Sequence, residues 1–344
     1  MIREPAFWWR SGTGALLVPL AAIYGAVAAL RMQNAGCKAG VPVICLGNLT
    51  VGGAGKTPAA IAVAQLLLAA HERPFFLSRG YGGQLSGPVR VNPATHRARD
   101  VGDEPLLLSR LAPTIVAKDR GAGAKFAHFT GASVVVMDDG LQNPSVTKDL
   151  TIVVVDGRRG IGNGRIIPAG PMRAPLGVQL ERAQALLVVG QPDGVAGLID
   201  RARRLGIAIF HARLEPDAGV VAAIGRRKAL AFAGIGDPEK FFATLTACGI
   251  EVAERTSFPD HHRYTAADAQ DLIARAQAKN LMLVTTEKDQ VRLVGEAALA
   301  ALAARTSMLP VRLVLEKMDA FRQMLLQAVQ RGREQSSRDQ AFGA

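Results

Sequence analysis

The residues with the clearest chemical potential lie in residues 47–58, which read Gly-Asn-Leu-Thr-Val-Gly-Gly-Ala-Gly-Lys-Thr-Pro. Glycines let a backbone wrap closely around phosphate oxygens, and Lys56 adds a positive point charge. Thr57 can offer its hydroxyl to Mg²⁺, and Pro58 suits a first helical turn, where its missing N–H costs little. The residues predicted to bind the phosphates of ATP are Gly52, Gly53, Ala54, Gly55, Lys56, Thr57 and Pro58.

A second group with chemical potential is the acidic pair Asp138 and Asp139. The pair follows residues 133–137, a continuous apolar run typical of a buried strand. Carboxylates at such a strand end, after a phosphate-binding loop, hold Mg²⁺ directly or through water. We therefore predict a metal site made by Thr57, Asp138 and Asp139, the alternative being an ordinary Asp-Gly turn.

Other candidate residues carry weaker local signals. Asp103 precedes Glu-Pro and by itself indicates a helix N-cap. His261 and His262 alone could be surface loop residues, and two adjacent side chains cannot both face one site. Arg79 and Arg120 could bind phosphate through bidentate contacts or could be solvated cations.

The elements around these residues must position them. The phosphate loop lies between an apolar run at residues 41–46, predicted to be a strand, and an alanine-rich run at 59–70, predicted to be a helix. Strand, glycine loop, Lys-Thr and helix form a phosphate-binding loop, in which the helix N-terminus attracts anions. A strict motif would have glycine at position 50, where this chain has Thr50. The alternative is a glycine turn before an ordinary helix, with Lys56 solvated.

Strands alternating with helices favour an α/β fold of the P-loop NTPase type, with a parallel sheet covered by helices on both faces. We predict an N-terminal membrane-associated helical segment at 1–38 and a P-loop core domain at 39–218. A smaller C-terminal α/β domain at 219–331 would include a last strand at 312–315. Residues 332–344 are predicted to be a disordered tail.

The N-terminal segment at residues 11–30 has no charged residue and is long enough to span a bilayer. Basic residues flank it on both sides, namely Arg3, Arg10, Arg31 and Lys38. The alternatives are a signal peptide, a transmembrane span, a buried core helix, and a helix lying in the membrane interface, kinked at Pro19. We favour the interfacial helix, because charge on both sides gives no clear orientation and export would separate the protein from ATP.

The composition narrows the partners and the compartment. The 344 residues carry a net charge of +12, which favours an anionic partner such as a membrane surface or a phosphorylated substrate. Basic patches interleaved with aromatic residues are absent from the sequence, so nucleic acid is not favoured. The three cysteines have no metal-binding spacing and fit a reducing cytosol. No obligate protein partner is inferred.

The chain resembles one family over nearly its whole length: tetraacyldisaccharide 4′-kinase, the lipid A 4′-kinase. Each matching motif is weak alone, but their joint order is highly specific. The matches are residues 47–58, Ser78-Arg79-Gly80-Tyr81-Gly82, Gly102-Asp103-Glu104-Pro105, Asp138-Asp139-Gly140-Leu141-Gln142, residues 162–164 with 168–171, Phe258-Pro259-Asp260-His261-His262 and Thr285-Thr286-Glu287-Lys288-Asp289.

The resemblance implies transfer of the γ-phosphoryl group of ATP to the 4′-hydroxyl of lipid A disaccharide 1-phosphate. The reaction would take place at the cytoplasmic face of the bacterial inner membrane, an anionic surface. By the same resemblance, Asp103 would be the catalytic base, paired with His261, and Lys56 would stabilise the transferring group. Asp138 and Asp139 would hold Mg²⁺. Arg79, Tyr81 and Arg120 would contact phosphate or the sugar headgroup.

The chain departs from the family pattern in three places: Ala54 replaces Thr, Leu141 and Asn143 replace Phe and His, and Ala174 replaces Glu. Two other functions remain open from the sequence. One is a nucleotide switch acting on protein partners, although Lys288 lies one position late for the guanine-recognition motif [NT]-K-x-D. The other is a membrane-surface protein with a regulatory ATP site.

Overall fold

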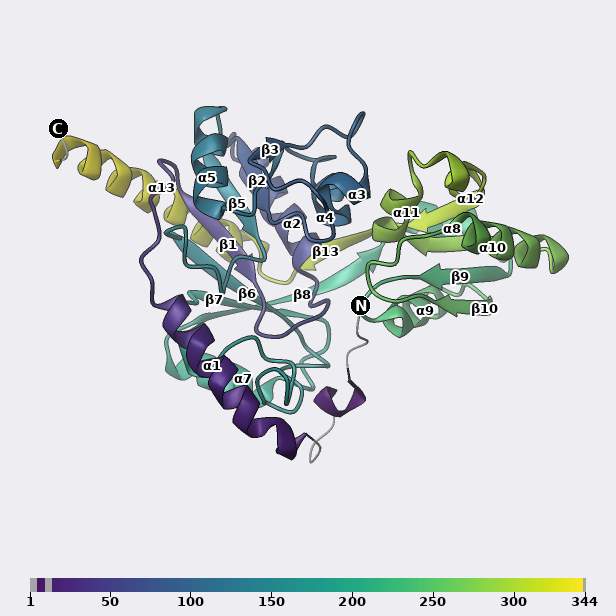
Figure 1. Ribbon diagram of the computed structural model, residues 1–344, viewed down its shortest axis with the longest axis horizontal. Helices are drawn as coiled ribbons and strands as arrows, with labels where there is room; N and C mark the ends of the chain where they lie inside the picture. The colour runs from purple at the N-terminus through teal and green to yellow at the C-terminus, as the bar shows by residue number, and fades with distance from the viewer. Residues whose placement is uncertain (1–4, 10–13, 343–344) are drawn as a thin grey trace.

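The computed structural model describes residues 5–9 and 14–342, and the expected flanking residues Arg3 and Arg10 lie outside these ranges. The described chain forms a large domain around a nine-stranded sheet and a smaller domain around a four-stranded sheet. Figure 1 shows the smaller domain beside the large one, with the N-terminal helix along a different edge. The predicted α/β fold is confirmed.

The large sheet has the strand order β13-β8-β7-β6-β1-β5-β2-β4-β3. Only the edge pairs β13–β8 and β3–β4 are antiparallel, and the other pairs are parallel. The strands are β1 Val43–Gly47, β2 Pro74–Ser78, β3 Val89–Arg90, β4 Thr114–Val116, β5 Val134–Asp138, β6 Leu150–Asp156, β7 Ala185–Val189, β8 Ala208–Pro216 and β13 Val311–Leu315.

Helices cover both faces of this sheet, so its central strands are continuously apolar. Ile44 and Leu46 of β1 pack toward α2, α4 and α13, whereas Val43 and Cys45 pack toward α5. Two further helices, α6 and α7, pack over β6 and β7 on the α5 side. The bounds are α2 Lys56–Ala69, α4 Asp103–Leu108, α5 Arg120–Phe129, α6 Leu176–Leu180, α7 Ala196–Arg204 and α13 Met318–Phe342; a short α3, Ala98–Val101, precedes α4.

The smaller domain has a parallel sheet in the order β10-β9-β11-β12. Its central strands β9 and β11 are apolar and are covered by two hydrophobic clusters, one including Phe242 of α9 and the other Leu272 of α10. The elements are α8 Ala218–Ile224, β9 Ala229–Ala233, α9 Pro238–Ala247, β10 Val252–Ser257, α10 Ala266–Ala278, β11 Met282–Thr286, α11 Glu287–Leu293, η3 Ala297–Leu299, α12 Ala300–Arg305 and β12 Thr306–Leu309.

The C-terminal boundary predicted for the smaller domain is wrong. The strand predicted at 312–315 is β13, and it pairs with β8 in the large sheet, with Leu313 opposite Leu214. The chain leaves the large sheet after β8 and returns beside the same point, where the Asp217 amide donates to the Pro310 carbonyl at 2.9 Å. The smaller domain is therefore an insertion between two neighbouring strands of the large sheet.

The predicted disordered tail is also wrong, because helix α13 continues to Phe342. Phe321 and Leu325 of this helix are buried in the core shared with α2. Beyond residue 331 the helix still contacts the body, since Arg333 forms an ion pair with Glu72. The polar composition of the tail reflects a helix exposed along most of its surface.

The N-terminal region forms η1, Ala6–Trp9, η2, Ala15–Leu17, and α1, Val18–Met32. Residues 15–32 are long and apolar enough to cross a membrane, by length and composition. Pro19 lies in the first turn of α1, so the predicted kink at this residue is wrong. One face of α1 packs on the body, where Gly25 allows close approach to Ile166. The other face leaves a row of apolar side chains exposed: Leu20, Ile23, Val27 and Leu30.

Candidate active site

The phosphate loop connects β1 to α2 and has the conformation that its glycines allow. Gly52 and Gly55 adopt φ values of 92° and 87°, in the left-handed region that favours glycine. A side chain at Gly53 would meet no atom within 4 Å, so the backbone faces open space there. Thr50, at the position where a strict motif has glycine, forms a backbone bridge with Met172. The departure at Thr50 thus lies in an extended segment that needs no glycine.

The acidic pair lies next to this loop because β1 and β5 are neighbouring parallel strands, with Leu46 opposite Asp138. Lys56 Nζ lies 3.9 Å from Asp139 Oδ1, and Arg173 Nη1 donates to the same oxygen at 2.6 Å. Burial opposes ionisation of Asp139, but Lys56 and Arg173 hold its pKa well below the usual range. Asp139 has a φ of 56°, a conformation uncommon for a residue with a side chain.

Asp138 is 1% exposed, and neither carboxylate oxygen has a hydrogen-bond partner among the described residues. Burial, together with the charges of Glu104 and Asp139, raises the pKa of Asp138 to about 7. A buried carboxylate with two unsatisfied oxygens is unfavourable unless a cation or a proton joins it. This arrangement fits a divalent cation, and the predicted third ligand, Thr57, is also buried, in the first turn of α2.

No group of three or more His, Cys, Asp or Glu side chains in the described part of the chain could hold a metal ion alone. Mg²⁺ is usually bound through one or two carboxylates, waters and substrate phosphates rather than by an all-protein cage. Thr57, Asp138 and Asp139 remain the predicted ligands, and the two unsatisfied oxygens of Asp138 are compatible with such an ion.

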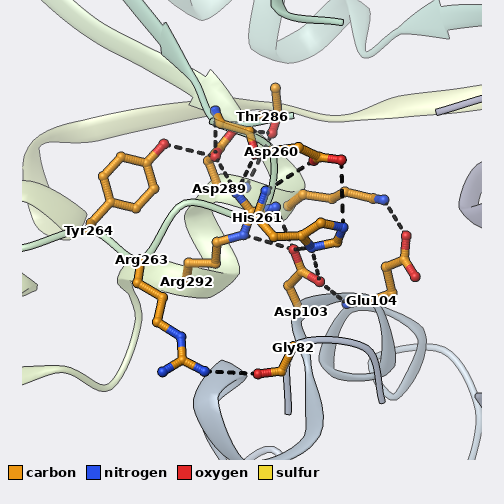
Figure 2. Close-up of polar contacts among 12 residues, drawn as sticks. Gly82, Asp103, Glu104, Asp260, His261, Arg263, Tyr264, Thr286, Asp289 and Arg292 are labelled. Carbon is orange, nitrogen blue, oxygen red and sulfur yellow. Dashed lines mark hydrogen bonds and ion pairs between the residues drawn. The ribbon is translucent and has the colours of Figure 1, made fainter. Parts of the chain in front are cut away.

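A second polar centre joins the two domains, as Figure 2 shows. Asp103 begins α4 of the large domain and is 4% exposed. His261 comes from the small domain, and its Nδ1 lies 3.2 and 3.1 Å from the two carboxylate oxygens of Asp103. The His261 amide donates to the Gly234 carbonyl at 3.0 Å, and His261 has a φ of 55°. His261 thus has an uncommon backbone conformation, and its imidazole ring faces Asp103.

The charges around this pair keep Asp103 ionised. Burial would raise the pKa of Asp103, but Arg292, His261 and Lys288 hold it far below its usual range. Burial would likewise lower the pKa of His261, but the hydrogen bond and charge of Asp103 raise it above the ordinary value. At neutral pH the pair consists of a carboxylate and an imidazole with increased proton affinity.

The predicted substrate-binding residues lie around these centres. Tyr81 packs edge-on against the His261 ring at a centroid distance of 5.0 Å. Arg120 is buried at the start of α5; its Nη1 donates to the Ala117 carbonyl, and its Nε has no hydrogen-bond partner within the described ranges. Burial lowers the pKa of Arg120 to about 10, although Asp138 and Asp139 oppose this shift. Arg79 is exposed, and its charge contributes to the lowered pKa of Arg120.

Several charged residues at the site were not predicted. Lys288 Nζ forms an ion pair with Glu104 Oε1 at 2.5 Å, and Arg292 contacts Asp103. Arg173 neutralises Asp139. Lys288 falls within a family motif, but nothing in its local pattern indicated a partner in the other domain. The spacing of Asp289 and Arg292, three apart on a helix, was the available signal for a buried pair.

Two of the three departures from the family pattern have structural consequences. Ala174 is buried and offers only its carbonyl, which accepts from Gln179 Nε2 at 2.7 Å, so no carboxylate is present there. Asn143 Oδ1 accepts from the amide and hydroxyl of Ser145, at 2.9 and 2.6 Å, and thereby closes the loop after the acidic pair. Ala54 is buried within the phosphate loop.

A glycine loop ending in Lys-Thr, a parallel sheet and an acidic strand end beside the lysine define a nucleotide-binding protein of the P-loop class. A profile of the Tetraacyldisaccharide-1-P 4′-kinase family matches residues 13–330. The chain belongs to this family of kinases, and the resemblance seen in the sequence is confirmed.

Similar proteins agree with this assignment over most of their length. A tetraacyldisaccharide 4′-kinase of Rhodopseudomonas palustris strain BisA53 is 52% identical over 326 residues, covering 94% of this chain and 95% of that protein. One of Bradyrhizobium sp. strain ORS 278 is 53% identical over 296 residues, covering 86% and 88%. A crystal structure of LpxK from Aquifex aeolicus, in complex with ATP, superposes with a TM-score of 0.71 at 25% identity, covering 92% of this chain and 100% of that chain.

Proposed function

We propose that this enzyme transfers the γ-phosphoryl group of ATP to the 4′-hydroxyl of tetraacyldisaccharide 1-phosphate, a step of lipid A biosynthesis. The observation that carries the proposal is family membership, supported by the arrangement of the candidate site. In that site Lys56 and the acidic pair lie at the carboxyl ends of neighbouring strands, and Asp103 and His261 form a hydrogen-bonded pair.

In the proposed mechanism, phosphoryl transfer depends mainly on positioning and on neutralising charge. Lys56 and the loop amides stabilise negative charge on the transferring group. Mg²⁺, held by Thr57, Asp138 and Asp139, would neutralise charge on the phosphate oxygens. Asp103, as the base paired with His261, accepts the proton of the sugar hydroxyl. Arg79, Tyr81 and Arg120 contact the phosphate or the sugar headgroup.

The Asp103–His261 pair suits proton transfer because its two members are already aligned across the domain interface. The charge of Asp103 raises the pKa of His261, so a proton that Asp103 accepts can pass to the imidazole and restore the carboxylate. Tyr81 contacts the His261 ring from the opposite domain. A hydroxyl placed beside Tyr81 would therefore lie beside the pair as well.

The exposed apolar face of α1 supports attachment to a membrane, where the acyl chains of the substrate reside. The inner face of α1 packs on the body, which favours a helix embedded in the cytoplasmic leaflet over one that projects freely. Figure 1 shows α1 along an edge of the large domain, with no other helix covering its outer side in this view. The net charge of +12 would attract an anionic inner-membrane surface.

Replacing Leu20, Ile23 and Val27 by serine is expected to lower the partition coefficient onto anionic vesicles by about tenfold or more, because each side chain loses apolar burial in the bilayer. Co-sedimentation with vesicles of phosphatidylglycerol and phosphatidylethanolamine measures this coefficient. The control is a triple serine variant at Leu205, Val294 and Met318, which are exposed apolar residues outside α1. Equal binding by both variants and the unchanged protein would contradict a role for α1 in attachment.

The activity is tested by incubating the protein with ATP, Mg²⁺ and tetraacyldisaccharide 1-phosphate, followed by mass spectrometry of the lipid. The expected product has gained one phosphate, and omission of Mg²⁺ abolishes it. Tight lipid binding without any added phosphate would instead support the membrane-surface protein considered from the sequence.

The nucleotide-switch alternative loses its sequence argument in the structure. Asp289, which would have to contact a guanine base, is fully buried and accepts hydrogen bonds from Tyr264, Thr286 and Arg292. Lys288 is paired with Glu104. Equal turnover with GTP and without lipid would restore that alternative.

A further inference from the structure

Resting on the proposed function, we propose that Arg292 is a positioning residue that fixes Asp103 against His261 and couples this pair to the core of the small domain. Arg292 lies on α11, whereas Asp103 begins α4 of the other domain. Figure 2 shows the guanidinium between Asp103 on one side and Asp289 on the other. None of the motifs recognised in the sequence contains Arg292.

The contact with Asp103 is a fork of two donors to one oxygen. Arg292 Nε donates to Asp103 Oδ2 at 2.7 Å, and Nη2 donates to the same oxygen. Both side chains are almost fully buried. Two N–H groups of a buried, planar guanidinium hold Oδ2 in a more defined position than a single flexible ammonium group would.

The far side of Arg292 is anchored in the small domain. Nη1 donates to the Gly234 carbonyl at 2.6 Å and to Asp289 Oδ1 at 2.9 Å. Asp289 in turn accepts from the Gly234 amide at 2.9 Å, from the Tyr264 hydroxyl at 2.8 Å and from the Thr286 hydroxyl at 2.6 Å. Gly234 also accepts from the amide of His261. The same backbone segment therefore holds both Arg292 and His261.

This network gives both carboxylate oxygens of Asp103 defined hydrogen-bond partners. Oδ2 faces Arg292 and His261, whereas Oδ1 faces His261 and accepts from the Glu104 amide at 2.9 Å. The carboxylate can rotate only by breaking contacts in both domains. The orientation of the Asp103 carboxylate therefore depends on the contact between the two domains.

The charged groups that face the pair come from three segments. Arg292 and Lys288 lie on α11, Asp260 precedes His261, and Glu104 follows Asp103. Lys288 is already paired with Glu104, so Arg292 supplies the cation in direct contact with Asp103. Removing this positive charge makes the pair bind a proton more readily, which raises its pKa and moves the acid limb of the activity profile to higher pH.

The test is the pH profile of kcat/KM for Arg292→Gln and Arg292→Lys, using ATP, Mg²⁺ and the disaccharide 1-phosphate. For Arg292→Gln we expect the midpoint of the acid limb to move to higher pH by about one unit or more. We also expect kcat to fall about 10- to 100-fold, whereas the KM for ATP stays within about twofold of wild type. For Arg292→Lys we expect an acid limb near that of wild type, because the charge remains, but a reduced kcat, because the fork is lost.

The matched control is Arg275→Gln, which removes a partly exposed ion pair with Glu254 in the same domain and should leave the profile unchanged. Thermal melts identify any variant that does not fold. If Arg292→Gln does not fold, the kcat of Arg292→Lys is the test. A wild-type acid limb and kcat in Arg292→Gln, or a wild-type kcat in Arg292→Lys, would overturn the inference. If wild-type protein adds no phosphate to the lipid, the proposed function fails instead.

Discussion

Replacing Asp103 by alanine is expected to lower kcat by about 10²- to 10⁴-fold, the range typical of a lost proton-transfer group. ATP affinity should stay within about twofold, because the contacts of Asp103 are with His261, Arg292 and the Glu104 amide rather than with the phosphate loop. Steady-state turnover and fluorescent-nucleotide titration measure the two quantities separately.

Asp103→Asn is the companion variant for this experiment, since alanine leaves the guanidinium of Arg292 buried without its partner. Asparagine keeps the shape of the side chain but removes the negative charge, so it should lose a similar factor in kcat. The control is Asp193→Ala, at an exposed carboxylate distant from the site in sequence. Near-wild-type turnover in Asp103→Ala would remove Asp103 from the base role.

Lys56→Met is expected to lower kcat at saturating ATP by about 10²- to 10³-fold, the loss typical of removing one group that stabilises transition-state charge. Lys56 is buried at the start of α2 and lies 3.9 Å from Asp139, so its charge is poorly screened by water. ATP binding should weaken as well, because the same charge contacts the phosphates in the ground state.

Lys125→Met is the matched control for Lys56→Met, because Lys125 is an exposed lysine on α5 of the same domain. Phosphate transfer by both variants is followed by the mass of the lipid product. If Lys56→Met retained wild-type kcat, the triphosphate would have to bind elsewhere in the molecule.

Local patterns were sufficient to predict the parallel core of the large sheet and the phosphate loop. The strands β1, β5 and β6 are mainly apolar along their whole length, a pattern typical of strands buried on both faces. Asp138 and Asp139 followed from the same pattern, because parallel neighbours place their carboxyl ends at one edge of the sheet.

Contacts between distant segments could not be predicted in this way. Strand β13 pairs with β8 across about ninety residues of inserted domain, and nothing in its short apolar run specifies that partner. Asp103 and His261 are 158 residues apart, and their local signals indicated an N-cap and a surface loop. Only the family resemblance joined them, and it did not point to Arg292.

The point where the small domain joins the large one has a practical consequence. Because the Asp217 amide and the Pro310 carbonyl are in direct contact, residues 218–310 could be excised and replaced by a tight reverse turn between β8 and β13. Such a deletion variant would keep all nine strands of the large sheet together with α13. Comparing this variant with the full chain would show whether nucleotide binding needs only the large domain while lipid phosphorylation also needs the small one.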